Sequence, residues 1–156
     1  MTGVIVLIVA LLVAVAAGLV LKARSGKVQS FDRTDHGDSP GISTSVNVIT
    51  GDDLGEPLGE RATLVQFSTE FCAFCPQTRV LLTGLSAEHP GVKFVEVDAA
   101  ENMDLTRRFK VFSTPTVLVV RPGGDIAARS SGKQQKAEMS QALQSVLDDA
   151  GHGARW

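Results

Sequence analysis

The sequence predicts an α/β fold, a sandwich with a central mixed β-sheet, preceded by one N-terminal transmembrane helix. Between about residues 44 and 150, β-rich runs alternate with segments that favour helices, which is the pattern of a sheet covered by helices. The last two β-rich runs are joined by a short turn, which predicts an antiparallel hairpin and therefore a mixed sheet. Residues 4–21 carry no charged or polar side chain, and these eighteen residues are just enough to span a bilayer core as a helix.

Residues 1–21 are expected to be a retained membrane anchor. The amino terminus is the only positive charge before the apolar run, whereas a cleaved signal peptide has a basic start and a shorter run. Cleavage after the Ala-rich stretch is the alternative. Basic residues outnumber acidic ones directly after the run: one acidic residue, Asp32, occurs among four basic ones, Lys22, Arg24, Lys27 and Arg33. Because Lys and Arg beside a span stay on the cytoplasmic side, we expect a single-pass protein of the cell membrane whose domain faces the cytoplasm.

Three further segments follow the anchor. Residues 22–43 are rich in Ser, Gly, Asp and Pro without apolar periodicity, which predicts a flexible linker. Residues 44–150 form the expected globular domain, and residues 151–156 a tail. The whole chain of 156 residues has 15 Lys plus Arg and 17 Asp plus Glu, a formal net charge of −2. Since there is no basic excess to neutralise a phosphate backbone, nucleic acid is not an expected partner.

The first half of the domain should alternate strands with a helix. Residues 45–49 favour a short strand, and the continuous β-rich run at residues 62–69 favours a strand buried on both faces. A helix is expected over residues 73–88, where a His-Pro-Gly sequence then ends it. Residues 92–98 follow as the next strand.

The second half should contain two helices and a hairpin. A helix is expected over residues 102–110 and an apolar strand over residues 116–121. The Pro-Gly-Gly-Asp sequence at residues 122–125 predicts a turn, so that residues 126–130 can pair back on the preceding strand. The last helix is expected over residues 133–150.

The two cysteines of the chain, Cys72 and Cys75, carry the clearest chemical signal. A CxxC sequence beside a βαβ pattern is a redox signature. Here it lies between a buried strand and the start of a helix, where free N–H groups and the helix dipole favour an anion. A cysteine at such a position can be a thiolate near neutral pH. Pro76 fits the first helical turn, where the N–H that proline lacks has no intrahelical partner.

This placement predicts a protein-disulfide oxidoreductase with distinct roles for the two thiols. Cys72, nearer the helix end and the surface, would attack a client disulfide; Cys75, one turn deeper, would resolve the mixed disulfide and release the reduced client. A purely stabilising disulfide is the competing interpretation. Because three-residue spacing closes almost no loop, such a bond would add little stability.

FCAFC after ATLVQFST, followed by STPT at the start of a later strand, resembles the thioredoxin family over about residues 44–150. Within the family the sequence is most similar to membrane-anchored bacterial thioredoxins. The resemblance implies a thioredoxin-like sandwich, disulfide-containing client proteins, and a thioredoxin reductase or another dithiol as electron donor; no cofactor is expected. It also implies that Thr114 and Pro115 form a cis-proline turn facing the CxxC sequence, where the backbone of Thr114 pairs with bound substrate like an added strand.

Four more substrate-binding positions follow from the resemblance. Phe71 stands where the family usually has Trp and keeps an apolar platform for the partner. Ala73 and Phe74 occupy the dipeptide that is usually Gly-Pro. Gly132 matches a family glycine that allows a partner to approach closely, although an ordinary turn glycine is an equal alternative.

Two departures concern proton transfer. The buried family Asp beneath the resolving cysteine falls at Gln66, which cannot take a proton from Cys75, and the nearby family Lys falls at Phe94. The usual proton relay is therefore absent. Glu96, two residues along the same strand, is a possible replacement, but a partly exposed strand carboxylate is the commoner situation. Slower resolution or a narrower range of partners is expected.

Three alternatives stay open. Metal or iron–sulfur binding would use Cys72 and Cys75 as half a site; because His36, His89 and His152 lie in expected loops or the tail, a second chain would have to complete it. A redox-inactive, thioredoxin-like interaction module is suggested by the lost relay. An exported thiol-disulfide exchanger would follow if the domain lay outside the membrane.

Overall fold

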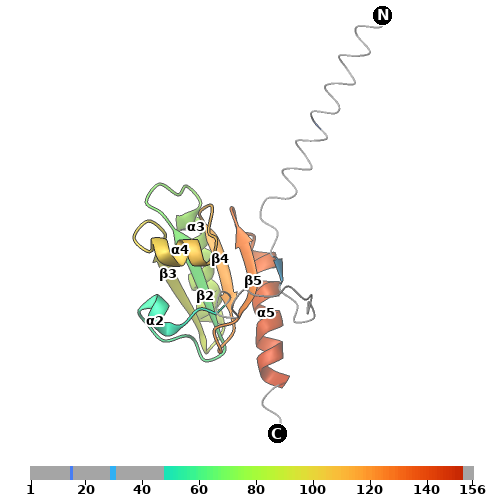
Figure 1. Ribbon diagram of the computed structural model, residues 1–156. Coiled ribbons are helices and arrows are strands. Elements are labelled where there is room, and N and C mark those ends of the chain that lie inside the picture. Colours follow the sequence, from blue (N-terminus) through green and yellow to red (C-terminus); the bar gives the residue numbers. More distant parts are fainter. Residues whose placement is uncertain (1–14, 16–28, 31–47, 153–156) are drawn as a thin grey trace, which may run out of the picture.

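The structure, a computed structural model, describes Val15, Gln29–Ser30 and residues 48–152. In this part of the chain five strands form one sheet with the order β1-β5-β4-β2-β3 (Figure 1). The strands are β1 (Gln29–Ser30), β2 (Ala62–Ser68), β3 (Val92–Asp98), β4 (Thr116–Val120) and β5 (Ile126–Ser131). The helices are α2 (Gly51–Leu54), α3 (Cys75–Glu88), α4 (Met103–Arg108) and α5 (Lys136–His152).

The sheet is mixed, as the sequence predicts. Strands β2 and β3 run parallel, with Gln66 opposite Glu96, while β4 pairs antiparallel with both β2 and β5. Every residue of β2 is buried, which is the environment that its continuous β-rich run indicates. The hairpin between β4 and β5 closes through a turn in which the Gly124 N–H donates to the Arg121 carbonyl.

Hydrophobic side chains fill both faces of the sheet. Because side chains alternate along a strand, β2 sends Leu64 toward one face and Val65 and Phe67 toward the other. On the first face Leu64 shares a core with residues of α3 and α5; on the second, Phe67 shares a core with residues beside α2 and α4. Gln66 points to the same face as Leu64, so its side chain lies between the sheet and α3.

Several boundaries differ from the expected ones. Of residues 45–49, the structure describes only the last two: Val48 makes an isolated bridge to Asp125, and Ile49 is fully buried. Helix α3 begins at Cys75 rather than residue 73, since Cys72 and Cys75 are still joined by a turn hydrogen bond. Helix α4 is shorter than expected by three residues, and α5 begins and ends later than expected.

Two short elements were not expected. Helix α2 is held by a capping box between Thr50 and Asp53, and Arg108 in α4 donates two hydrogen bonds to the Asp53 carboxylate. Strand β1 lies in the segment expected to be linker: Gln29 and Ser30 pair with β5, so that the expectation of unpaired chain is wrong at these two residues.

The proposed anchor lies almost entirely outside the described residues. Of residues 4–21, only Val15 is described, and most of the linker, 22–43, and of the tail, 151–156, also lies outside. Within the parts that the structure describes, no helix is both long enough and apolar enough to cross a membrane.

Truncation of Phe67 tests the packing of the sheet. Its ring is fully buried and lies 6.5 Å, centroid to centroid, from the ring of Phe109. Phe67→Ala should lower the free energy of unfolding by about 3–5 kcal/mol, because it removes buried apolar surface and leaves a cavity. Phe71→Ala is the matched control, since the Phe71 side chain is 92% exposed. In the control, the free energy of unfolding measured in urea should change by about 0.5 kcal/mol or less. An equal loss of unfolding free energy in both variants would contradict this packing.

Candidate active site

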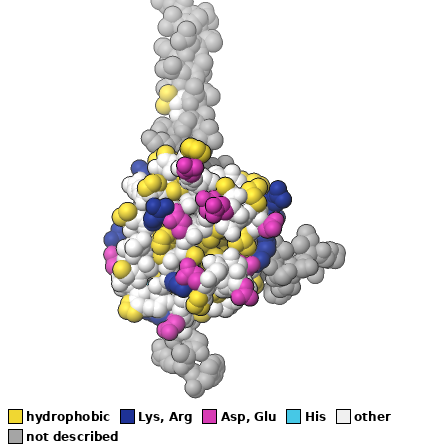
Figure 2. Space-filling model, turned by 90° about the vertical axis from the view of Figure 1, so that its left-hand side faces the viewer, with side chains coloured by type: hydrophobic (Ala, Val, Ile, Leu, Met, Phe, Trp, Pro, Cys, Tyr) yellow, Lys and Arg dark blue, Asp and Glu magenta, His cyan; other side chains and the backbone are white. Residues whose placement is uncertain are grey.

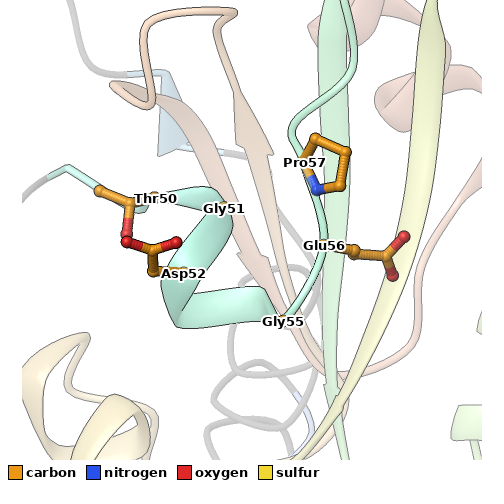
Figure 3. Close-up of a pocket in the computed structure, with 6 residues that line it drawn as sticks. All are labelled: Thr50, Gly51, Asp52, Gly55, Glu56 and Pro57. Atoms are coloured by element: carbon orange, nitrogen blue, oxygen red, sulfur yellow. The ribbon is translucent and has the colours of Figure 1, made fainter.

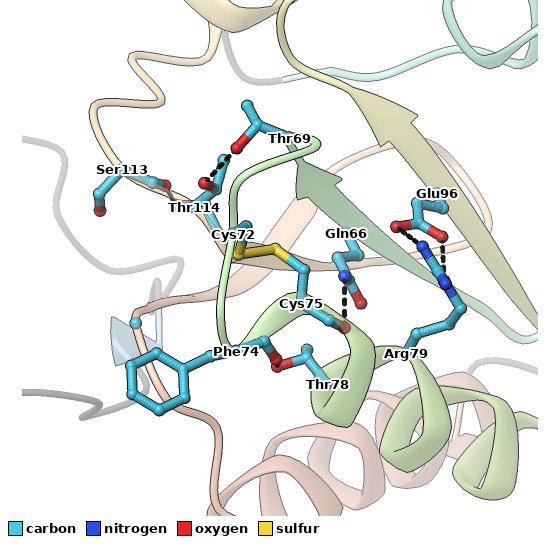
Figure 4. Close-up of a disulfide and its surroundings, with 12 residues drawn as sticks. Gln66, Thr69, Cys72, Phe74, Cys75, Thr78, Arg79, Glu96, Ser113 and Thr114 are labelled. Atoms are coloured by element: carbon cyan, nitrogen blue, oxygen red, sulfur yellow. Dashed lines mark hydrogen bonds and ion pairs between the residues drawn. A yellow bond between two sulfur atoms is a disulfide. The ribbon is translucent and has the colours of Figure 1, made fainter.

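A disulfide joins Cys72 and Cys75 where β2 leads into α3 (Figure 4). The loop between them is built from successive turns: the Cys72 N–H donates to the Thr69 carbonyl at 3.2 Å, and the Cys75 N–H to the Cys72 carbonyl at 3.3 Å. Cys75 is the first residue of α3 and is only 3% exposed, whereas Cys72 lies ahead of the helix and is half-buried. An external thiol or disulfide therefore reaches Cys72 more readily than Cys75.

The start of α3 explains this difference in exposure. Phe74 is the N-cap residue, and the next position after Cys75 is Pro76, which suits a first turn with no intrahelical acceptor. The Thr78 N–H and hydroxyl both donate to the Phe74 carbonyl. These bonds fix the first turn of the helix and keep the Cys75 side chain on its inner face.

The loop before β4 lies beside the disulfide. Its Thr114-Pro115 peptide bond is cis, as expected. The hydroxyls of Thr69 and Thr114 are 3.0 Å apart and joined by a hydrogen bond, which links this loop to the one that carries Cys72. On the other side, the Gly132 N–H donates to the Pro115 carbonyl at 2.8 Å. The structure thus brings Thr114, Pro115 and Gly132 to the same site as the cysteines.

Gly132 has a left-handed backbone, with φ of +85°, and nothing lies within 4 Å of where a Cβ would be. The turn therefore favours glycine for its backbone conformation, while the space above it stays open.

Exposed apolar side chains lie in the segments that carry the cysteines and the cis-proline. Phe71 is 92% exposed and Phe74 47%, and Ala73 between the cysteines is also exposed. Sequence reasoning missed Phe112, which is 90% exposed and lies two residues before Thr114. It also missed Thr69. Phe112 could have been found as a large apolar residue beside the STPT sequence, but no local signal marks Thr69.

Gln66 lies directly beneath Cys75. Its side chain is fully buried, and its Nε2 donates to the Cys75 carbonyl at 3.1 Å (Figure 4). The Gln66 Oε1 is buried without a hydrogen-bond partner. Phe94 is half-buried and packs against the core on the same face. A neutral amide and a phenyl ring therefore occupy the positions at which an acid and a base would be expected.

Glu96 is tied to Arg79 of α3 rather than to a cysteine. The Arg79 Nε and a terminal guanidinium nitrogen donate to the two carboxylate oxygens of Glu96 at 2.5 and 2.8 Å. These hydrogen bonds hold the pKa of the Glu96 carboxyl below its ordinary value; partial burial opposes the shift, and a hydrogen bond from Ser68 adds to it. Glu96 is thus kept ionised and engaged by Arg79.

The lowered pKa of Glu96 predicts a pH dependence of stability. A carboxyl whose pKa is lower in the folded than in the unfolded state stabilises the fold above its unfolded pKa, about 4.3, and this stabilisation is lost as pH falls through the folded pKa. Glu96→Gln should therefore differ most from wild type at neutral pH and least at about pH 3. Arg79→Gln, which removes the cause of the shift, should behave likewise. Urea unfolding at both pH values tests this; an unchanged acid-induced loss of stability in Glu96→Gln would contradict it.

One pocket in the described part of the chain lies away from the cysteines. It is lined by Thr50, Gly51, Asp52, Gly55, Glu56 and Pro57 around α2 (Figure 3). This segment leads into the N-terminal end of β2, whereas the cysteines follow its C-terminal end. The pocket is therefore separate from the disulfide.

The described surface shows neither a basic patch on the face in Figure 2 nor a cluster of metal ligands. On the face shown in Figure 2, Lys and Arg side chains lie among Asp and Glu side chains rather than in a basic patch. Among the described residues, no three His, Cys, Asp or Glu side chains gather as a metal ion would require.

A protein of this fold whose half-buried Cys72 is paired with a buried Cys75 is a thiol-disulfide oxidoreductase. The thioredoxin family model matches residues 46–145, and the chain belongs to this family. The α/β sandwich with its mixed sheet, expected from the resemblance, is thus confirmed.

Known proteins agree with this assignment. A thioredoxin from Chlamydia pneumoniae is 27% identical over 82 residues, which cover 53% of this chain and 80% of that protein. Protein disulfide-isomerase A4 from Mus musculus is 29% identical over 101 residues, which cover 62% of this chain and only 16% of that protein. The structure of a thioredoxin from Halobacterium salinarum matches in fold, with a TM-score of 0.52 at 20% identity over 68% of this chain and 86% of that one.

Proposed function

We propose that this protein reduces disulfides in client proteins while tethered to a membrane. The observation that carries the proposal is the unequal exposure of the two cysteines, 3% for Cys75 against a half-buried Cys72. In the reduced protein the Cys72 thiolate attacks one client sulfur, and the other leaves as a thiolate that takes up a proton. The Cys75 thiol then loses its proton and attacks Cys72, which releases the second client sulfur as a thiol. Two electrons pass to the client, and the Cys72–Cys75 disulfide remains.

The cycle requires a second dithiol that reduces this disulfide again. Membership of the thioredoxin family supports a thioredoxin reductase, or another dithiol carrier, as the donor. In either case the donor attacks the exposed sulfur of Cys72, for the same reason of access that makes Cys72 the first thiol to act.

The tether and its direction rest on the sequence. The apolar run of residues 4–21 supports a single membrane span, and the resemblance to membrane-anchored bacterial thioredoxins agrees. The four basic residues that follow support a domain on the cytoplasmic side. There the surroundings would keep the pair reduced; on the outer side the same domain would serve as an exported exchanger or oxidant.

Labelling in intact cells tests the cytoplasmic placement. With the domain inside, a membrane-impermeant maleimide should leave Cys72 unlabelled in whole cells after mild reduction and label it once the cells are permeabilised. Substituting Lys22, Arg24, Lys27 and Arg33 by Gln should weaken or invert this protection. Labelling of Cys72 in intact cells expressing the wild-type chain would place the domain outside. The protein would then be an extracytoplasmic exchanger.

A redox-inactive interaction module is the second candidate. The specific observation in its favour is the buried side chain of Gln66 under Cys75, because its neutral amide does not accept a proton from the thiol. Both thiols are nevertheless present and paired. Catalytic turnover therefore distinguishes the two candidates.

A further inference from the structure

We propose that the paired hydroxyls of Thr69 and Thr114 determine client specificity by binding a hydrogen-bonding side chain next to the client's disulfide cysteine. The inference rests on the proposed reduction of client disulfides and names the class of client. Such a client presents Ser, Thr, Asn or Gln beside its cysteine, with apolar residues further along an extended segment.

The position of the pair is the first argument. Thr69 lies at the end of β2, and its carbonyl accepts the Cys72 N–H at 3.2 Å. Thr114 precedes the cis-proline and lies 45 residues after Thr69 in the sequence. Its hydroxyl is 3.0 Å from that of Thr69. The pair thus joins the loop of Thr114 to the segment that leads to Cys72, and Figure 4 shows it near the disulfide. A segment bonded to Cys72 and lying along this loop must pass over it.

The hydrogen-bonding capacity of the pair is the second argument. Each hydroxyl has one hydrogen to donate and two lone pairs, and their mutual bond uses one hydrogen and one lone pair. One hydrogen and three lone pairs therefore face other partners. Both threonines are partly exposed, so water can serve these groups in the free protein. A client that covers them with an apolar side chain leaves them unpaired, whereas a polar side chain replaces the water.

The surroundings of the pair are the third argument. Phe71 lies two residues after Thr69 and is 92% exposed; Phe112 lies two residues before Thr114 and is 90% exposed. The threonine contact joins the two loops, and each of these loops carries an exposed phenyl ring two residues from the hydroxyl pair. A segment with one polar residue beside its cysteine and apolar residues further out complements both features.

The expected discrimination follows from the cost of unpaired polar groups. A site built to hydrogen-bond a group rejects an analogue that lacks it, so kcat/KM should be on the order of 10-fold higher for a client with Ser than for one with Ala beside the cysteine. Valine matches threonine in shape but lacks the hydroxyl. In Thr69→Val/Thr114→Val the preference should therefore fall to about 2-fold or less.

The test compares two disulfide-linked peptides that differ only in Ser or Ala beside the cysteine, with hydroxyethyl disulfide as a small substrate. The full chain and its variants are assayed for kcat/KM. Thr114→Ser, which restores a hydroxyl, should keep the preference, and so should Thr83→Val, a matched change at an exposed position on α3. Hydroxyethyl disulfide is too small to cover the hydroxyl pair, so the kcat/KM of each protein for this substrate is the reference for its own peptide rates. Only Thr83→Val is expected to keep the wild-type value.

Three results would be decisive. A preference for the Ser peptide that disappears only in the valine variants supports the inference. If Thr69→Val/Thr114→Val keeps the wild-type ratio of kcat/KM between the Ser and Ala peptides and still reduces hydroxyethyl disulfide, the inference is overturned and the proposed function is left intact. If the wild-type chain reduces none of the three substrates, the proposed function is overturned, and the inference with it. If the double variant does not fold, the Thr69→Val single variant gives the same comparison.

Discussion

Replacement of Cys72 by serine should abolish disulfide reduction, whereas replacement of Cys75 should leave client proteins covalently attached to the protein. A serine hydroxyl is not ionised near neutral pH and does not displace a thiolate from a disulfide, so the Cys72→Ser variant cannot begin the exchange. In Cys75→Ser the first attack still occurs, because Cys72 is the more exposed thiol. The mixed disulfide then persists, since no resolving thiol is present.

Mass spectrometry after incubation with an oxidised client protein measures this difference. Cys75→Ser should accumulate an adduct of the size of one client, sensitive to dithiothreitol, and Cys72→Ser should accumulate little. Alkylation of the reduced wild-type protein at mildly acidic pH gives independent evidence on the two thiols. Faster labelling of Cys75 than of Cys72 would reverse the assigned roles.

Gln66→Asp should accelerate the resolution of mixed disulfides at a cost in stability. Gln66 is fully buried and its amide donates to the Cys75 carbonyl, so an ionisable group placed there lies under the thiol that must lose a proton. A positioned proton acceptor typically contributes 10²-fold or more, and the shorter aspartate should provide at least about 10-fold. Burying an ionisable group should lower the free energy of unfolding by about 1–3 kcal/mol.

Gln66→Asn is the matched control for this change. It shortens the side chain and disturbs the same hydrogen bond without adding an acid, so it should lose stability without gaining speed. Stopped-flow decay of a preformed mixed disulfide measures the resolution rate for each protein. If aspartate and asparagine resolve the mixed disulfide at the wild-type rate, Gln66 does not lie on the route of the proton.

Much of the sheet could be predicted because its signals are local. The continuous β-rich run from Ala62 predicts a strand buried on both faces, and the structure ends that strand within one residue of the expected position. The Pro-Gly-Gly-Asp sequence likewise fixes the hairpin, with the Arg121 N–H donating to the Asp125 carbonyl. The placement of Gln66 under Cys75 was expected from the resemblance and is confirmed by their hydrogen bond.

Features that depend on distant contacts could not be predicted from the sequence. Helix α2 has only four residues, too few for any periodicity, and is held by Arg108, 55 residues further along the chain. The hydrogen bond between Thr69 and Thr114 joins residues 45 positions apart, and the sequence around each threonine contains no pattern that predicts it. Likewise the position of Glu96 on β3 makes it a candidate proton acceptor for Cys75, but only the structure reveals that its carboxylate is hydrogen-bonded to Arg79.

Reduction of insulin with dithiothreitol as the regenerating dithiol tests the central claim most directly. If Cys72 and Cys75 form a catalytic pair, the full wild-type chain should accelerate insulin reduction at substoichiometric concentration, and Cys72→Ser should not accelerate it beyond dithiothreitol alone. A wild-type protein that gives no acceleration over dithiothreitol would contradict the account and favour the redox-inactive interaction module.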